Sequence, residues 1–277
     1  MSIQWFPGHM AKTRRALAEQ LRWVDVVIEL GDGRAPASSR NPLLEQLLGP
    51  KPQLVLLNKS DLADDRWTEK WVNELRRNGP VFPVSAVRGM GMARIVPELE
   101  RLAQPVLNHL AGKGIRPRPV RVMVVGIPNI GKSTLINQLA GGAKAKTGNR
   151  PGVTRGNQWI RIHQKVELLD TPGMLWPKFE DPLVGRKLAA LGTIKDEILD
   201  NEELAGWLLD WLHKFYPQSL QRYGDINHGQ GISLEEIGRV RGCLLSGGRV
   251  NTLKAAQILL REFRAGQLGK VTMDQDI

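Results

Sequence analysis

The pattern GxxxxGKS at residues 126–133 has the residue types and spacing of a phosphate-binding loop. Its glycines let backbone N–H groups wrap around phosphates, and the N-terminus of the following helix adds partial positive charge. We expect Lys132 to reach the β- and γ-phosphates and the Ser133 hydroxyl to ligate Mg²⁺. The residues of this loop predicted to bind a nucleotide are Asn129, Ile130, Gly131, Lys132, Ser133 and Thr134.

Two later segments carry residues suited to the γ-phosphate and its metal ion. Asp170 begins the sequence DTPG after an apolar run, where its carboxylate can hold Mg²⁺ through water and the Gly173 N–H can meet the γ-phosphate. Thr154, in PGVT, can close over Mg²⁺ and the γ-phosphate when GTP is bound. In isolation each residue is typical of a loop cap, but their order after the phosphate-binding loop favours the nucleotide. Catalytic roles are therefore predicted for Lys132, Thr154 and Gly173.

The sequence NKSD at residues 58–61 predicts the group that recognises the base. The Asp61 carboxylate can accept hydrogen bonds from guanine N1–H and N2–H₂, whereas adenine offers no such pair of donors. The Lys59 stem is expected to cover the ring, and Asn58 to complete the motif. Ser85 and Ala86 are expected to contact guanine O6 through a backbone N–H. The alternative interpretation of NKSD is a helix N-cap.

Alternating apolar strands and amphipathic helices are expected to position these motifs. The strands are predicted at 23–30, 53–57, 81–84, 120–125 and 165–169, and the intervening helices at 65–78, 92–110 and 132–140. This alternation predicts an α/β domain with a mostly parallel sheet over residues 1–178. Helical periodicity then dominates, with helices predicted at 201–216, 233–242 and 252–265, so residues 179–277 are expected to form a small all-helical domain.

The order of the motifs is itself informative. In Ras-like GTPases the phosphate-binding loop comes first and the guanine motifs come last, whereas here NKSD precedes that loop. The same sheet can form when the original termini are joined and the chain is cut elsewhere, because domain termini often lie close together. The fold class expected is a circularly permuted P-loop GTPase domain followed by the helical domain. The segment around Asp170 would then lead directly into that helical domain.

Composition restricts the cellular context and the partners. The net charge is +11, and residues 101–166 contain no Asp or Glu, which favours a polyanionic partner over a merely solvated basic surface. The single cysteine, Cys243, excludes an internal disulfide and a multi-cysteine zinc site. We see neither a signal peptide nor 18 consecutive apolar residues, and therefore expect a cytoplasmic protein without membrane contact.

With its motifs in this order, the chain resembles the circularly permuted ribosome-assembly GTPases of the YlqF/RbgA type (ribosome biogenesis GTPase A). The resemblance covers nearly the whole chain, including WFPGHMAK at the start, DGRAP at residues 32–36, the five permuted motifs and LLREFRAGQLGK near the end. It implies GTP hydrolysis to GDP, a role in late maturation of the large ribosomal subunit, and contact of the helical domain with rRNA. We expect a monomer that does not bind DNA.

The resemblance also indicates which residues to consider for catalysis. Ras-like enzymes place a water-orienting Gln after the DxxG glycine, but the residue here is Met174, which cannot orient water. His9 is a candidate for that role; a surface or RNA-contact histidine is the alternative. In similar GTPases an Asn at the position of Asn129 accompanies potassium stimulation, so the resemblance implies a K⁺ ligand, and a loop-stabilising amide is the alternative.

The last predicted helix carries Lys254, Arg261 and Arg264 beside its apolar face. The region from residue 190 onward holds more acidic than basic residues, so rRNA contact would need this local patch; a solvated charged face is the alternative. A second function consistent with the motifs is a GTP-dependent switch acting on a protein outside the ribosome. A P-loop ATPase or kinase is disfavoured by NKSD.

Overall fold

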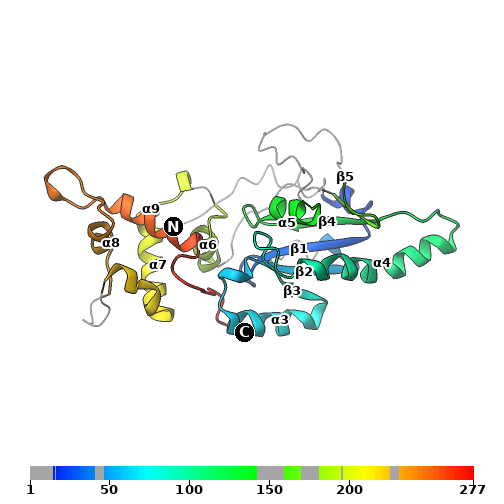
Figure 1. The fold of residues 1–277 in the computed structure, drawn as a ribbon, viewed down its shortest axis with the longest axis horizontal. Coiled ribbons are helices and arrows are strands. Elements are labelled where there is room, and N and C mark those ends of the chain that lie inside the picture. Colours follow the sequence, from blue (N-terminus) through cyan, green and yellow to red (C-terminus); the bar gives the residue numbers. More distant parts are fainter. Residues whose placement is uncertain are drawn as a thin grey trace. The chain divides into compact units, whose positions relative to one another are not determined.

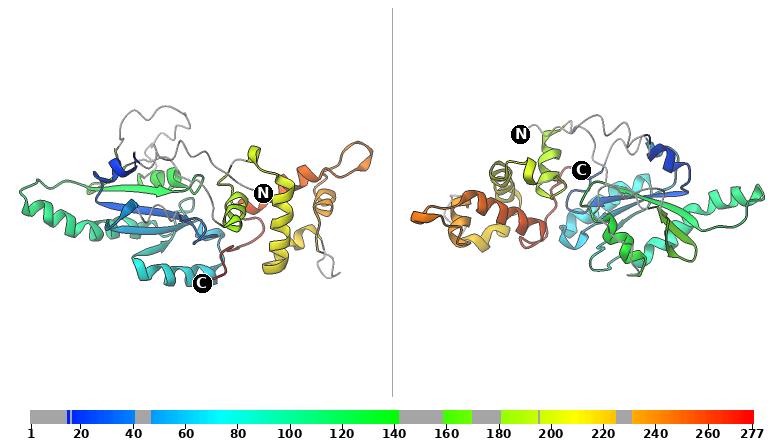
Figure 2. Two further views of the ribbon diagram at one scale, coloured as in Figure 1. Left: turned by 180° about the vertical axis from the view of Figure 1, so that it is seen from behind. Right: turned by 90° about the horizontal axis from the view of Figure 1, so that it is seen from above.

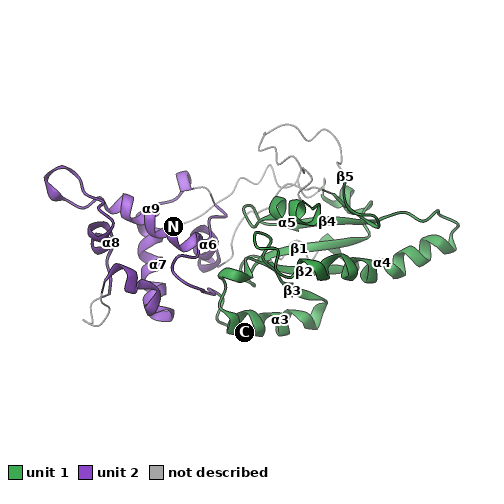
Figure 3. Ribbon diagram, viewed as in Figure 1, with its two compact units in different colours: residues 1–180, 274–277 green, residues 181–273 purple. Residues whose placement is uncertain are grey.

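The computed structural model describes residues 15, 17–40, 47–141, 159–169, 181–194, 196–224 and 231–277. The chain divides into two compact units, residues 1–180 with 274–277 and residues 181–273 (Figure 3). No helix within the described ranges is both long and apolar enough to cross a bilayer.

The first unit is built on a six-stranded sheet with the order β3-β2-β1-β4-β6-β5 (Figure 1). All neighbouring strands are parallel except β5 and β6, which are antiparallel. The central strand β1 is buried throughout, as expected of a strand with parallel neighbours on both sides. The strands are β1 (Val26–Asp32), β2 (Gln53–Asn58), β3 (Val81–Pro83), β4 (Val120–Gly126), β5 (Trp159–His163) and β6 (Val166–Leu169).

Strand β5 was not predicted from the sequence. It has five residues and forms an edge of the sheet, where its side chains are only partly buried or exposed. A short alternating segment without a buried face carries a weak strand signal, and only its pairing with β6 defines it.

Apolar side chains explain how the helices of this unit pack. Trp71, Val72 and Leu75 of α3 (Asp65–Leu75) lie on one stripe and pack against Val55 and Leu57 of β2. Helix α4 (Ile95–Gly112) contacts β1, β2, β4 and β6, and α5 (Lys132–Leu139) contacts β4 and β5. The described part of this unit also contains three 3₁₀ turns: η1 (Ser60–Leu62), η2 (Arg76–Asn78) and η3 (Met92–Arg94).

The described residues of the second unit are mainly helical, and Figure 2 shows this unit from two further directions. At the start of each described α-helix in this unit, a short polar side chain accepts a hydrogen bond from a backbone N–H group of the first turn, which defines where the helix begins. Ser233 and Glu236 form the predicted capping box of α8, and Asp200 accepts from the N–H groups of Glu202 and Glu203 in α7. The elements are α6 (Pro182–Ala190), η4 (Asp196–Ile198), α7 (Asn201–Phe215), η5 (Pro217–Tyr223), α8 (Leu234–Val240), η7 (Ser246–Gly248) and α9 (Thr252–Arg264).

The last four residues require a correction to the expected domain division. Asp274 belongs to the first unit, because its carboxylate accepts the N–H groups of Ala37 and Ser38 at 2.8 Å and the Ser38 hydroxyl at 2.6 Å. Its carbonyl oxygen accepts from the Trp71 indole N–H at 2.9 Å. The assignment of all residues 179–277 to a helical domain is therefore wrong for residues 274–277. Contacts between residues more than 200 positions apart leave no local signal in the sequence.

Candidate nucleotide-binding site

The carboxyl ends of three parallel strands of the sheet bring the predicted nucleotide motifs together. Strand β4 leads into the phosphate-binding loop, β2 into NKSD, and β3 into the segment containing Ser85. Strand β1 lies between β4 and β2, with Leu30 paired to Gly126 and Asp32 paired to Asn58. Ligands of open α/β sheets bind at this edge, so the permuted chain order still produces one continuous site.

Two glycines of the phosphate-binding loop cannot carry a side chain. Gly126 has a φ of 159°, and an added Cβ would lie 2.6 Å from the carbonyl oxygen of Leu30. Gly131 has a φ of 102°, and its Cβ would lie 2.5 Å from the Asn58 side-chain nitrogen. The pattern therefore reflects close approach of the loop to both β1 and the NKSD segment.

Asn58 connects the phosphate-binding loop to the segment containing Ala86. Its side-chain nitrogen donates to the carbonyl oxygen of Ile130 at 2.8 Å, and its side-chain oxygen accepts the Ala86 N–H at 3.0 Å. The side chain is buried, so both bonds are shielded from water. The Ala86 N–H, which the sequence assigned to guanine O6, is engaged by Asn58 here, and its contact with the base stays a prediction.

Lys59 extends from NKSD toward the phosphate-binding loop. It adopts the left-handed conformation, with φ 59°, and its ammonium group lies 3.1 Å from an Asp32 carboxylate oxygen and donates to the Asn129 carbonyl oxygen at 3.2 Å. Asn129 is the other described non-glycine residue with positive φ, at 58°. The Lys59 stem is therefore held across the two motifs, which suits its predicted contact with the base.

Asp32 and Arg34 anchor Lys59, and sequence reasoning assigned neither of them to the site. Both are almost fully buried, and the Arg34 guanidinium donates to both carboxylate oxygens of Asp32, at 3.0 and 2.9 Å. Burial alone would raise the pKa of Asp32, but the charges of Arg34 and Lys59 and the hydrogen bonds from Arg34 lower it well below its usual range. The available signal was an Asp at the end of a buried strand.

Asp61 lies in η1, which is fixed to the end of β3 by a hydrogen bond from the Ser60 N–H to the Val84 carbonyl oxygen. Its side chain is 11% exposed, and one carboxylate oxygen lies 2.9 Å from Nε of Arg88. Arg88 follows the Ser85–Ala86 segment. The two segments predicted to recognise guanine are thus joined by an ion pair that the sequence did not indicate.

Lys132 is buried at the start of α5 and folds back over its own loop. Its ammonium group donates to the carbonyl oxygens of Gly126 at 3.1 Å and Ile127 at 2.8 Å. Ser133 and Thr134 are exposed in the first turn of the same helix. The cation and the hydroxyls are therefore close to where a polyphosphate would lie.

The structure does not place four of the predicted residues. His9, Thr154, Asp170 and Gly173 lie outside the described residues. Among the residues that are described, no group of three or more His, Cys, Asp and Glu side chains could hold a metal ion. The structure thus places the predicted base and phosphate motifs, while the γ-phosphate segments remain predictions.

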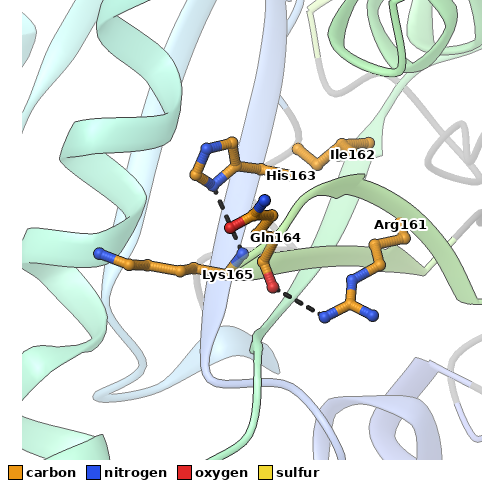
Figure 4. A pocket seen from close by; sticks show the side chains of 5 residues that line it. All are labelled: Arg161, Ile162, His163, Gln164 and Lys165. Atoms are coloured by element: carbon orange, nitrogen blue, oxygen red, sulfur yellow. Dashed lines mark hydrogen bonds between the residues drawn. The ribbon is translucent and has the colours of Figure 1, made fainter.

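Acidic residues outside the acid-free stretch 101–166 pair with several of its basic residues, which weakens its support for a polyanionic partner. The ion pairs are Arg101–Glu98, Arg118–Asp25, Arg121–Glu167 and Lys165–Glu100. In the hairpin between β5 and β6, the Arg161 guanidinium donates to the Gln164 carbonyl oxygen at 2.8 Å (Figure 4). Lys113 and Arg116 are exposed and lack an ionic partner within the described part of the chain.

The basic patch predicted on the last helix also needs correction. Arg264 donates to the carbonyl oxygens of Ala189 and Ala190 and pairs with the Asp196 carboxylate, so it links α9 to α6 and η4. Lys254 and Arg261 are exposed and line a groove on α9. Arg264 therefore has a structural role, and the surface available to an anion depends on the other two.

Comparison with known proteins gives a consistent result. A family model described as a 50S ribosome-binding GTPase matches residues 121–223. Ribosome biogenesis GTPase A of Bacillus cereus is 48% identical over 278 residues, covering 99% of this chain and 94% of that protein. Mitochondrial ribosome-associated GTPase 1 of Mus musculus is 37% identical over 299 residues, covering 99% of this chain and 90% of that protein.

Solved structures agree with the architecture. The crystal structure of GNP-bound YlqF from T. maritima has a TM-score of 0.68 and 26% sequence identity, covering 96% of this chain and 100% of that one. The GDP-bound form has a TM-score of 0.67 and 26% identity, covering 94% of this chain and 98% of that one.

Proposed function

The chain belongs to the ribosome biogenesis GTPase A family of circularly permuted GTPases, and from this we propose that it hydrolyses GTP while promoting late assembly of the large ribosomal subunit. The observation that carries the proposal is the bridge made by Asn58, which joins the phosphate-binding loop to the guanine-recognition segments at one sheet edge. Titration of the purified protein with guanine and adenine nucleotides, followed by hydrolysis assays with each, tests the nucleotide assignment. Tighter binding of adenine nucleotides would exclude it.

The roles proposed for individual residues follow from this arrangement. Asp61 recognises the base, with Asn58, Lys59, Ser85 and Ala86 completing its surroundings. Backbone N–H groups of Asn129, Ile130 and Gly131, with the side chains of Lys132, Ser133 and Thr134, bind the phosphates. The exposed Ser133 hydroxyl in the first turn of α5 fits a Mg²⁺ ligand, because Mg²⁺ prefers oxygen donors beside phosphates. Thr154, Asp170 (through water) and Gly173 would complete the metal and γ-phosphate site.

We propose His9 as the group that orients the attacking water, because Met174 stands where a Gln would otherwise act. The support for this role is the sequence alone.

A potassium effect is a further prediction, motivated by the position of Asn129. This residue is exposed within the phosphate-binding loop, and its left-handed backbone presents the carbonyl oxygen to Lys59. We expect K⁺ to accelerate GTP hydrolysis more than Na⁺ at equal ionic strength, and Asn129→Ala to abolish the difference. Initial rates in the two chloride salts measure this, and equal rates in the parent protein would leave Asn129 as a loop-stabilising amide.

The proposed partner is the large ribosomal subunit, and the contact is with the rRNA of that subunit. We propose that the protein binds as a monomer, in the cytoplasm. Support comes from the relatives' names and from the exposed Lys254 and Arg261 on α9. Arg264 is bound to Ala189 and Asp196 within the second unit, so Arg264→Ala should mainly lower the stability of that unit. Arg261→Ala should instead weaken binding to the subunit, because it removes a contact with rRNA phosphates.

Nucleotide state is expected to control this docking. Residues 170–174 sense the γ-phosphate in the proposed site and lead along the chain into the second unit, so GTP and GDP should favour different domain arrangements. We expect GTP to tighten binding to the subunit by ~5–150-fold, equivalent to 1–3 kcal/mol, and the subunit to tighten GTP binding by the same factor. Binding of the full chain to purified large subunits with GDP, GTP and a non-hydrolysable analogue, each at two salt concentrations, measures this coupling.

Affinity for the subunit should also fall steeply with salt, because phosphate contacts release counterions. His9→Ala should retain GTP-dependent docking while slowing release from the particle. Equal affinity in all nucleotide states would contradict the coupling, and GTP-dependent capture of a protein outside the ribosome would favour the alternative switch function.

A further inference from the structure

Arg88 occupies a defined position beside the base-recognition carboxylate. Ser85 and Met90 exchange two backbone hydrogen bonds of 3.1 Å, which close a tight hairpin containing Arg88. The Arg88 N–H also donates to the Ser85 hydroxyl at 3.3 Å, and Ser85 is almost fully buried. The hairpin backbone therefore holds the base of the Arg88 side chain beside Asp61.

The contact between the two side chains is asymmetric. Nε of Arg88 lies 2.9 Å from one carboxylate oxygen of Asp61, and the Asp61 side chain is 11% exposed while that of Arg88 is 64% exposed. Arg88 thus approaches from the solvent side, with Nε as its nearest donor to the carboxylate. A carboxylate oxygen can accept more than one hydrogen bond, so this contact leaves acceptor capacity for a ligand.

Recognition of guanine requires more than the presence of a carboxylate. Parallel hydrogen bonds to N1–H and N2–H₂ form only when the carboxylate plane is aligned with the base. The terminal torsion of an Asp side chain is broad, so its own rotamer preference does not fix that plane. The Arg88 contact supplies this restraint.

We propose that Arg88 is a specificity-determining residue of the guanine site, which orients Asp61 for its two-point contact with the base. This inference rests on the proposed role of Asp61. It predicts that Arg88 contributes most to the binding affinity of nucleotides whose base offers two hydrogen-bond donors. Hypoxanthine retains N1–H but lacks the N2 amino group, and a single hydrogen bond tolerates rotation of the carboxylate.

The test compares GDP and inosine diphosphate on the purified full chain. We expect Arg88→Ala to weaken GDP binding by about 3- to 10-fold and inosine diphosphate binding by less than about 2-fold. These effects are modest because solvent screens the charge of the exposed Arg88 side chain. Arg88→Lys, which keeps the charge, should recover part of the preference for GDP. Dissociation constants from calorimetric titration at two salt concentrations provide the measurement, and the effect should shrink at high salt.

Arg77→Ala is the matched control. Arg77 is an exposed arginine of the same unit whose guanidinium lies 2.8 Å from Glu74, away from the predicted nucleotide motifs. Its replacement should leave both affinities unchanged.

A double-variant cycle separates this inference from the assignment of the site. In an Asp61→Asn background, Arg88→Ala should have little further effect on GDP, because the oriented carboxylate is gone. Equal weakening of both nucleotides by Arg88→Ala, or no weakening of either, would overturn the role of Arg88. If Asp61→Asn itself left GDP affinity unchanged, the guanine site would instead be wrongly assigned.

Discussion

Lys132→Ala is expected to lower GTP turnover by roughly 100- to 1000-fold, the loss typical of removing one preorganised charge or donor from a transition state. The ammonium group lies at the start of α5, where it donates to the carbonyl oxygens of Gly126 and Ile127. When nucleotide binds, those bonds would be exchanged for phosphate oxygens, so the cation is already held within the loop. Single-turnover hydrolysis at saturating GTP is the appropriate measurement.

Two further variants make this result interpretable. Lys113→Ala removes an exposed lysine of the same unit and should leave turnover unchanged. Ser133→Ala should also reduce hydrolysis, since it removes the proposed Mg²⁺ ligand, and raising Mg²⁺ should recover part of the loss. Thermal unfolding of each variant checks that the loop still folds. Hydrolysis by Lys132→Ala at the parent rate would refute the phosphate-site assignment.

Asp61→Asn is expected to weaken GTP binding by about 2–4 kcal/mol, or roughly 30- to 900-fold, because an amide mismatches the donors N1–H and N2–H₂. Xanthine presents a carbonyl oxygen in place of the N2 amino group, so the variant should gain affinity for xanthosine nucleotides. Competition titrations with both nucleotides measure this reversal.

The control is the same substitution at Asp276, which is exposed near the end of the chain. It should change neither affinity. Unchanged GTP affinity in Asp61→Asn would remove this carboxylate from the base site, even if the protein remained a competent GTPase.

Much of the fold followed from local sequence patterns. The loop at 126–133 was identifiable because the residues predicted to bind phosphate are consecutive. The contacts that require glycine at Gly126 and Gly131, with Leu30 and Asn58, were not visible in the sequence. Helix α3 and the capping box of α8 were likewise confirmed, since apolar spacing and N-caps act within a few residues. The permuted motif order was also readable directly from the chain.

Local patterns were less informative about charge. Residues 101–166 contain no acidic residue, yet Asp25, Glu98, Glu100 and Glu167 pair with their arginines and lysines. A run of like charge in sequence is therefore not a run of free charge in space, because acidic residues outside the run, on the same helix or on other elements, supply counter-charges.

The sequence by itself determined which segments are predicted to bind phosphate and base, because each motif is short and its chemistry lies in adjacent residues. Only the tertiary structure decided how those segments support one another. Asp32 fixes Lys59 and Arg88 contacts Asp61 across separate elements, and Asp274 reaches Ser38 from the far end of the chain. Such contacts depend on three-dimensional proximity at the sheet edge, and no spacing along the chain encodes them.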